Sequence, residues 1–150
     1  MTMPPNTPTT PSRLAWSLGL AGLIPFVALA LMAHMADPVH SRSAAAVLAA
    51  YGATIVSFLG AIHWGLGMRD PQGPQAPGLV WGVVPSLLGW AALVLQPAHG
   101  LLVLALTLVA CVLVDHKKYP DHGLRDWLPL RWVLTVVATT CCASAAVRWA

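Results

Sequence analysis

The chain has 150 residues, of which 57% are hydrophobic and only 9% are charged. A soluble domain carries about 25% charged residues, so this chain has too few charges for a surface that faces water on every side. Its net charge of +3 comes from Lys and Arg residues that are dispersed along the sequence. The dispersed basic residues argue against nucleic-acid binding. The high hydrophobic and low charged content make the lipid bilayer the expected surrounding.

The composition divides the chain into a short tail and one hydrophobic domain. Residues 1–12 are rich in Pro, Thr and Ser, a composition typical of a disordered tail. Residues 13–150 are expected to form a single transmembrane domain, because four or five helices of about 20 residues would use most of the length. We therefore predict an all-α integral membrane protein, a bundle of about five transmembrane helices.

Hydrophobic runs and turn residues place the five spans. Pro25 and Pro85 fall inside the first and third spans and are expected to kink them, since proline removes a backbone donor. We expect a loop at 37–42 and a tight hairpin at 97–100, where Asp, Pro, His and Gly interrupt the apolar pattern. The predicted spans cover about 14–35, 43–68, 78–96, 101–115 and 128–148.

The basic residues predict an orientation. With five spans, the N-terminal tail and the loops after the second and fourth spans share one side of the membrane. Loops rich in Lys and Arg stay on the cytoplasmic side, so we expect a cytoplasmic N-terminus and a periplasmic C-terminus. The tail side carries Arg13, Arg69, Lys117, Lys118, Arg125 and Arg131, whereas the opposite side carries only Arg42 and Arg148.

Small residues recur at every fourth position of the second span. Small side chains at this spacing let another helix approach closely, so we expect a helix–helix contact there. The partner helix could belong to this chain or to another subunit. The predicted packing stripe consists of Ala45, Ala49, Ala53, Ser57, Ala61 and Gly65.

One ionisable side chain, His63, falls inside the second span. Ionisable residues within a span face the bundle or a wet cavity and are candidates for function. The alternative is a neutral histidine that hydrogen-bonds a neighbouring helix or reaches toward the headgroups. Either way, its environment decides its role.

The predicted topology brings further polar and aromatic residues to the depth of His63. A pair of Asp115 with Arg131, or of Asp115 with His63, would neutralise charge in a medium of low dielectric. Such a cluster is either a structural ion pair or a site for a lipid headgroup, a quinone ring or a partner's loop. The candidate ligand or partner residues are His63, Trp64, Asp115, Tyr119, Trp127 and Arg131.

Other chemistry is not indicated. Cys111, Cys141 and Cys142 lie in apolar runs without a CxxC pair, and the six histidines show no HxH or HExxH spacing. We therefore expect neither a metal nor a cofactor. An enzyme is also not expected, since the only plausible catalytic grouping is His63 with Asp115.

Three motifs carry a family resemblance. They are Gly-Leu-Ala-Gly-Leu-Ile-Pro-Phe at 19–26, Tyr-Gly-Ala-Thr-Ile-Val-Ser-Phe-Leu-Gly-Ala-Ile-His-Trp-Gly at 51–65, and Trp-Leu-Pro-Leu-Arg-Trp-Val-Leu-Thr at 127–135. Together they resemble the domain-of-unknown-function 3429 family, which includes the mitochondrial transmembrane protein 69, over about residues 14–148. The resemblance implies a multi-pass protein of the bacterial inner membrane with a mitochondrial relative, and it supplies no activity.

Two functions remain open at this point. Small size and the long small-residue face favour a non-catalytic accessory, assembly or stabilising subunit of a larger respiratory or other energy-converting membrane complex. The alternative is a protein that binds or transports a quinone, a lipid or a small solute at a cytoplasmic-side site around His63. Expected partners are thus the bilayer, other membrane subunits, and possible lipid or quinone, but no nucleic acid.

Overall fold

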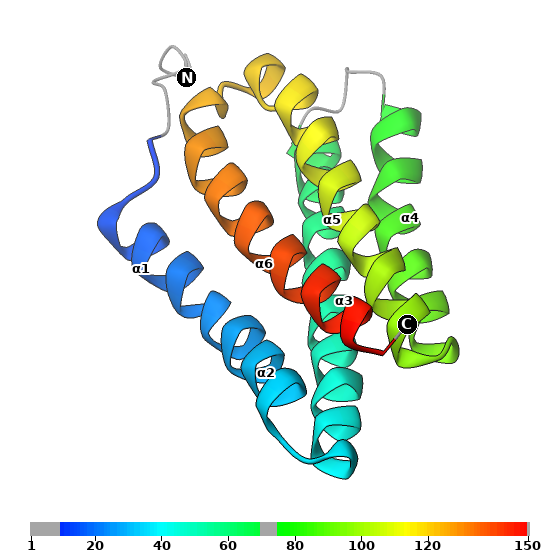
Figure 1. The fold of residues 1–150 in the computed structure, drawn as a ribbon. Coiled ribbons are helices and arrows are strands. Elements are labelled where there is room, and N and C mark those ends of the chain that lie inside the picture. The colour runs from blue at the N-terminus through cyan, green and yellow to red at the C-terminus, as the bar shows by residue number, and fades with distance from the viewer. Residues whose placement is uncertain (1–9, 70–74, 150) are drawn as a thin grey trace, which may run out of the picture.

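A computed structural model describes residues 10–69 and 75–149, and the regular structure in these residues is helical (Figure 1). Most of the tail predicted at 1–12 therefore lies outside the described residues. Two short 3-10 turns, η1 and η2, separate the last two long helices. The elements are α1 (Arg13–Ala21), α2 (Leu23–Met35), α3 (Pro38–Arg69), α4 (Gln75–Val94), α5 (Pro97–Lys118), η1 (Pro120–His122), η2 (Arg125–Trp127) and α6 (Leu128–Arg148).

The prediction of an all-helical protein with five spans is confirmed. Five helical stretches of the described residues are long and apolar enough to cross a bilayer. The first of them consists of α1 and α2 together. In Figure 1, α1 begins, α3 ends, α4 begins and α5 passes into α6 at the upper end of the bundle. The α2–α3 and α4–α5 connections and the C-terminal end of α6 lie lower, as five alternating crossings require.

The first span is interrupted at Gly22, which separates α1 from α2. Pro25 has no N–H to donate to the carbonyl four residues before it, so the helical ladder is weakened at this point. The hydroxyl of Tyr51 on α3 donates a hydrogen bond to the carbonyl oxygen of Gly22 over 2.9 Å. The Tyr51 ring also meets Phe26 edge-on, with 5.0 Å between ring centroids. These contacts from α3 stabilise the chain at the point where the first span is interrupted.

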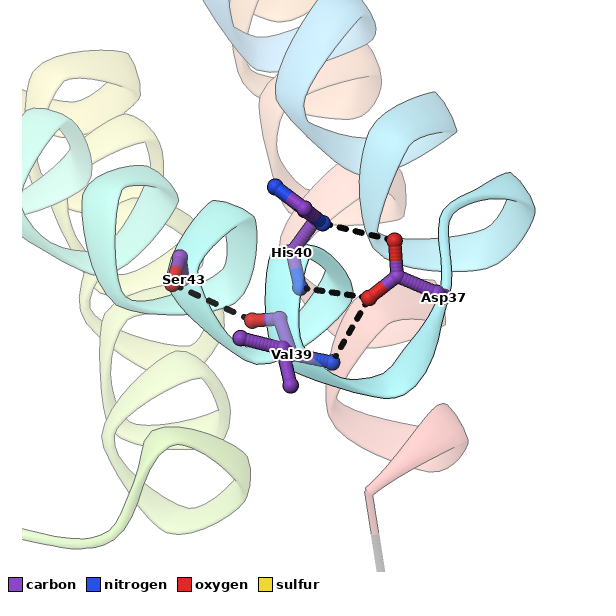
Figure 2. Close-up of polar contacts among 4 residues, drawn as sticks. All are labelled: Asp37, Val39, His40 and Ser43. Carbon is purple, nitrogen blue, oxygen red and sulfur yellow. Dashed lines mark hydrogen bonds and ion pairs between the residues drawn. The ribbon is translucent and has the colours of Figure 1, made fainter.

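The loop expected at 37–42 is wrong, because α3 already begins at Pro38. Asp37 caps this helix: its Oδ1 accepts hydrogen bonds from the backbone N–H groups of Val39 and His40 at 3.1 and 3.3 Å (Figure 2). Its Oδ2 lies 2.6 Å from Nδ1 of His40. Proline is favoured at the first helical position, where its missing N–H would have no partner. An Asp-Pro pair therefore starts a helix here.

The hairpin expected at 97–100 is also wrong, for the same reason. Pro97 is the first residue of α5, and the amide of Gly100 donates to the carbonyl oxygen of Gln96 at 2.9 Å. Gly100 is needed for close packing, since an added methyl group would meet the backbone of Ala92 on α4. The α4–α5 connection is consequently shorter than predicted, and α5 gains a turn at each end.

Helix α3 packs against α2, α4, α5 and α6, but the predicted stripe does not stay on its packed face. Ala45, Ala49 and Ala53 are buried and Ser57 is partly buried, whereas Ala61 and Gly65 are exposed. A step of four residues turns a helix by about 40° more than one full turn, so a stripe with this period winds around the helix. The contact with α4 continues from Ala53, a member of the stripe, to Gly60, which is not a member. These two residues face Gly89 and Gly82 of α4.

Candidate functional site

Three charged or ionisable side chains from three helices meet around Asp115. Nε2 of His63 lies 2.9 Å from Oδ1 of Asp115. Nε of Arg131 donates to Oδ2 of Asp115 at 2.7 Å, and Nη2 of Arg131 lies 2.6 Å from the same oxygen. All three residues are buried, and Asp115 is only 1% exposed. The structure thus forms both of the pairs considered from the sequence.

The direction of each span explains this meeting. His63 lies in the last two turns of α3, Asp115 lies in the last turn of α5, and Arg131 lies in the first turn of α6. The second and fourth spans end, and the fifth begins, at the same end of the bundle. Helices of alternating direction therefore place these three distant residues at one depth.

The charges of the cluster largely cancel. Asp115 and Arg131 form an ion pair, and burying an ion pair costs less than burying either charge alone. A carboxylate has no proton to give, so Nε2 of His63 must carry the proton in its contact with Oδ1. His63 is a donor to Asp115 whether its ring is neutral or charged. With a neutral ring, the three residues together carry no net charge.

Tyr119 extends the cluster beyond the end of α5. It is 3% exposed, and burial, with a smaller contribution from the nearby charge of Asp115, raises the pKa of Tyr119 to about 12, although Arg131 partly opposes the shift. The hydroxyl therefore keeps its proton at neutral pH.

Trp64 does not join the other candidates. Its Nε1 donates to the carbonyl oxygen of Leu79 at 3.0 Å, at the start of α4. Its indole also covers Gly82, where an added methyl group would collide with it. Consecutive helical residues point about 100° apart, so His63 and Trp64 face different neighbours. Trp64 packs α4 on α3.

A cavity of about 410 Å³ lies beside the cluster. Its lining comes from both halves of the first span, from α3, from Leu108 on α5, and from the segment that runs from Tyr119 through α6. Most lining residues are apolar, but Tyr119, Trp127, Arg131 and Thr135 also contribute. Ligand sites in proteins have this size and this mixture of many apolar and few polar groups.

Unpaired polar atoms belong to the lining of this cavity. Among the described residues, two that line the cavity have a buried side-chain polar atom with neither a hydrogen-bond nor an ion-pair partner. Most buried polar atoms in proteins are paired, because an unpaired one costs free energy. The two atoms are Trp127 Nε1 and Thr135 Oγ1, whereas Nη2 of Arg131 is held in the ion pair with Asp115.

The sequence did not single out Thr135 or predict the cavity. Thr135 is 3% exposed and lies one helical turn after Arg131, on the same face of α6. That spacing of four residues was the available signal. The cavity itself depends on how α1 and α2 meet α3 and α6, which no local pattern encodes.

Other kinds of chemistry find little support in the described part of the chain. No group of three or more His, Cys, Asp or Glu residues there could hold a metal ion. Cys111, Cys141 and Cys142 are free thiols, and the first and last of them are buried. The site is thus a set of fixed hydrogen-bond donors beside an apolar cavity.

Comparisons with known proteins give a family and no activity. The family model described as "Protein of unknown function (DUF3429)" matches residues 11–147. The chain is 36% identical to Transmembrane protein 69 of Xenopus tropicalis over 126 residues, which are 81% of this chain and 49% of that protein. It is 32% identical to Transmembrane protein 69 of Mus musculus over 126 residues, or 79% of this chain and 49% of the relative. The chain thus spans about half the length of these relatives. No solved structure matches it.

Proposed function

This chain belongs to the DUF3429 family, and from its cavity we propose that it binds an amphipathic, lipid-soluble molecule within the membrane. The observation that carries this proposal is the cavity of about 410 Å³, whose apolar walls end at a buried Asp115–Arg131 pair. The apolar chain of such a molecule would pack against the walls, and its polar head would lie near Arg131. We propose a binding role without catalysis.

The rim of the cavity supports entry from the bilayer. Leu18 on α1 and Phe58 on α3 line the cavity, yet they are 64% and 65% exposed. Large apolar side chains at an opening favour contact with lipid over contact with water. A lipid-soluble molecule would therefore reach the cavity sideways, between α1 and α3, without crossing an aqueous compartment.

The test fills the cavity. Ala15 lies on α1, lines the cavity and is partly buried, whereas Ala28 on α2 is exposed and outside the lining. The protein is purified in a mild detergent, and native mass spectrometry records small molecules that remain bound. We expect Ala15→Phe to lose a bound molecule that the original protein and Ala28→Phe retain. Equal retention by all three proteins would contradict binding in this cavity.

A second proposal is an accessory, assembly or stabilising role in a larger energy-converting membrane complex. It is supported by the second half of the predicted stripe, where Ala61 and Gly65 are exposed and an added methyl group at Gly65 would touch nothing within 4 Å. Small residues on an open face suit another helix. Native gels of membranes at natural expression should show a large species that Ala61→Leu reduces and Ala50→Leu, at another exposed position of α3, leaves intact. Migration as a lone small species would contradict this role.

We also propose a cytoplasmic N-terminus in a bacterial inner membrane. Arg131 is buried in an ion pair, so it drops out of the charge count and leaves Arg13, Arg69, Lys117, Lys118 and Arg125 against Arg42 and Arg148, which is five against two. This asymmetry still favours the same orientation. A fluorescent protein that folds only in the cytoplasm should fluoresce at the N-terminus and stay dark at the C-terminus. The reverse pattern would contradict the orientation.

A further inference from the structure

The unpaired atoms beside the cavity are all able to donate a hydrogen bond. An indole Nε1–H and a guanidinium N–H are donors only, and a threonine hydroxyl can donate or accept. In this structure the unpaired atoms belong to Trp127 and Thr135. Arg131 also lines the cavity, and its guanidinium has N–H groups beyond those of Nε and Nη2 that face Asp115. A bound group that relieves the unpaired donors must therefore supply acceptors.

Thr135 differs from Thr107 and Thr140 in the partner of its hydroxyl, and it differs from Thr139, whose buried hydroxyl is also unpaired, because it lines the cavity. The hydroxyls of Thr107 and Thr140 each donate to the carbonyl oxygen four residues earlier in their own helices, at 2.8 Å. This bond is the usual way for a threonine in an apolar helix to satisfy its hydroxyl. Thr135 has no such partner among the described residues, although it is 3% exposed. Its hydroxyl is free to meet an acceptor in the cavity.

The charge of the site selects among acceptors. Arg131 is already neutralised by Asp115, whose Oδ2 receives its Nε–H at 2.7 Å. An anionic head would gain the attraction of Arg131 but would also meet the repulsion of Asp115 at low dielectric. An uncharged acceptor meets no such repulsion. The site therefore favours a neutral head.

We propose that the cavity holds an uncharged head that bears carbonyl oxygens, attached to an apolar chain, with the carbonyls hydrogen-bonded to Thr135, Trp127 and Arg131. This inference rests on the proposed binding function and names the class of its ligand. A membrane quinone and a neutral acyl ester share this chemistry. The chain would extend along apolar lining residues such as Leu23 and Phe26 toward Ile55.

Four probes, each with an apolar chain of decyl length, test which polar head the cavity prefers. They are a decyl-benzoquinone, a monoacylglycerol ester, the anion decanoate, and decylbenzene, which has no acceptor. Binding to the purified full chain is measured by native mass spectrometry and by the shift of the thermal unfolding midpoint. We expect the quinone or the ester to bind at least about tenfold more tightly than decylbenzene, since paired donors are regained, and more tightly than decanoate. The tighter of the two neutral carbonyl probes identifies the source.

Two substitutions remove donors: Thr135→Val keeps the shape of the side chain, and Trp127→Phe keeps an aromatic ring of smaller size. Each should weaken binding of the tighter carbonyl probe by about three- to tenfold. Thr135→Val should leave decylbenzene unchanged, and Trp127→Phe should weaken the carbonyl probe more than decylbenzene. The controls are Thr140→Val and Trp90→Phe, at exposed positions, and they should change neither. Removal of an unpaired hydroxyl leaves the unliganded protein at least as stable, so weaker binding by Thr135→Val is not a loss of folding.

The outcomes separate this inference from the proposed function. If decylbenzene or decanoate binds as tightly as the carbonyl probes, or if Thr135→Val and Trp127→Phe bind them normally, the neutral carbonyl head is wrong. A molecule displaced by Ala15→Phe would then still uphold binding in the cavity. If none of the probes binds and nothing co-purifies, both proposals fail.

Discussion

Gly60 on α3 and Gly82 on α4 lie so close that a side chain at either position would collide. An added methyl group at Gly60 would meet the carbonyl oxygen of Gly82, and one at Gly82 would meet the indole of Trp64. Together with Gly89 against Ala53, this contact joins the second and third spans through their backbones. Pro85 on α4 also approaches Gly60, so the backbone of α4 lies close to α3 where its own ladder lacks a donor.

This contact predicts a loss of stability on Gly60→Ala. Because the obstacle is backbone rather than a flexible side chain, the helices must move apart, which costs about 1–3 kcal/mol. Gly65→Ala is the control, since nothing lies within 4 Å of the added methyl group, and it should be neutral or stabilising. Thermal unfolding in detergent measures both. Equal midpoints for the two variants would show that α3 and α4 are not tightly packed there.

The Asp115 cluster predicts a stronger effect. Asp115→Asn leaves the buried guanidinium of Arg131 uncompensated, which costs about 3–5 kcal/mol. Asp121→Asn, at an exposed residue of η1, should cost little. The difference in stability is measured by titration with a denaturing detergent, with the loss of helicity as the readout. Similar midpoints for these two variants would mean that Asp115 is not the counter-ion of Arg131.

A double substitution separates structure from binding at this cluster. Apolar residues of similar volume can replace a buried ion pair without loss of stability, so Asp115→Leu combined with Arg131→Met should recover much of the stability lost in Asp115→Asn. It should not recover binding of a carbonyl probe, because the Arg131 donor is gone. Binding equal to that of the original chain would show that the pair serves folding alone.

Local patterns predict the spans well but not the cavity. Hydropathy is a property of each segment, so five crossings follow from the sequence, and alternating direction then places His63, Asp115 and Arg131 at one end. The sequence pattern places Pro38 and Pro97 in loops, whereas each is the first residue of a helix, a position that suits proline. The contacts of Trp64 and Thr135 depend on which neighbouring helix each helical face packs against, and the sequence of a single segment does not contain that information.

Asp37 predicts a dependence of stability on acid. The hydrogen bond with the His40 side chain, and then those with the backbone, hold the pKa of Asp37 below its usual 3.8. A lowered pKa in the folded state means that the contribution to stability is complete above 3.8 and is lost as the pH falls through the folded value. Asp37→Ala should therefore unfold at a lower temperature than the original chain at neutral pH, and this gap should close in acid. His40→Ala should move the loss to higher pH, closer to 3.8. A gap that does not change with pH would contradict the cap.

The bond from Tyr51 to Gly22 predicts that α1 is held in place from α3. Tyr51→Phe keeps the ring against Phe26 but removes the 2.9 Å hydrogen bond at the break in the first span. A lost hydrogen bond of this kind costs about 1 kcal/mol, which corresponds to roughly fivefold more opening. Hydrogen exchange should accelerate by about that factor in residues 13–21 and stay unchanged in α5. Thr140→Val, which removes a bond within α6, should leave α1 unaffected.

Because α1 forms one wall of the cavity, a bound amphipathic molecule should slow hydrogen exchange in α1 of both the original and the Tyr51→Phe chains. Unchanged exchange would show that the ligand lies elsewhere.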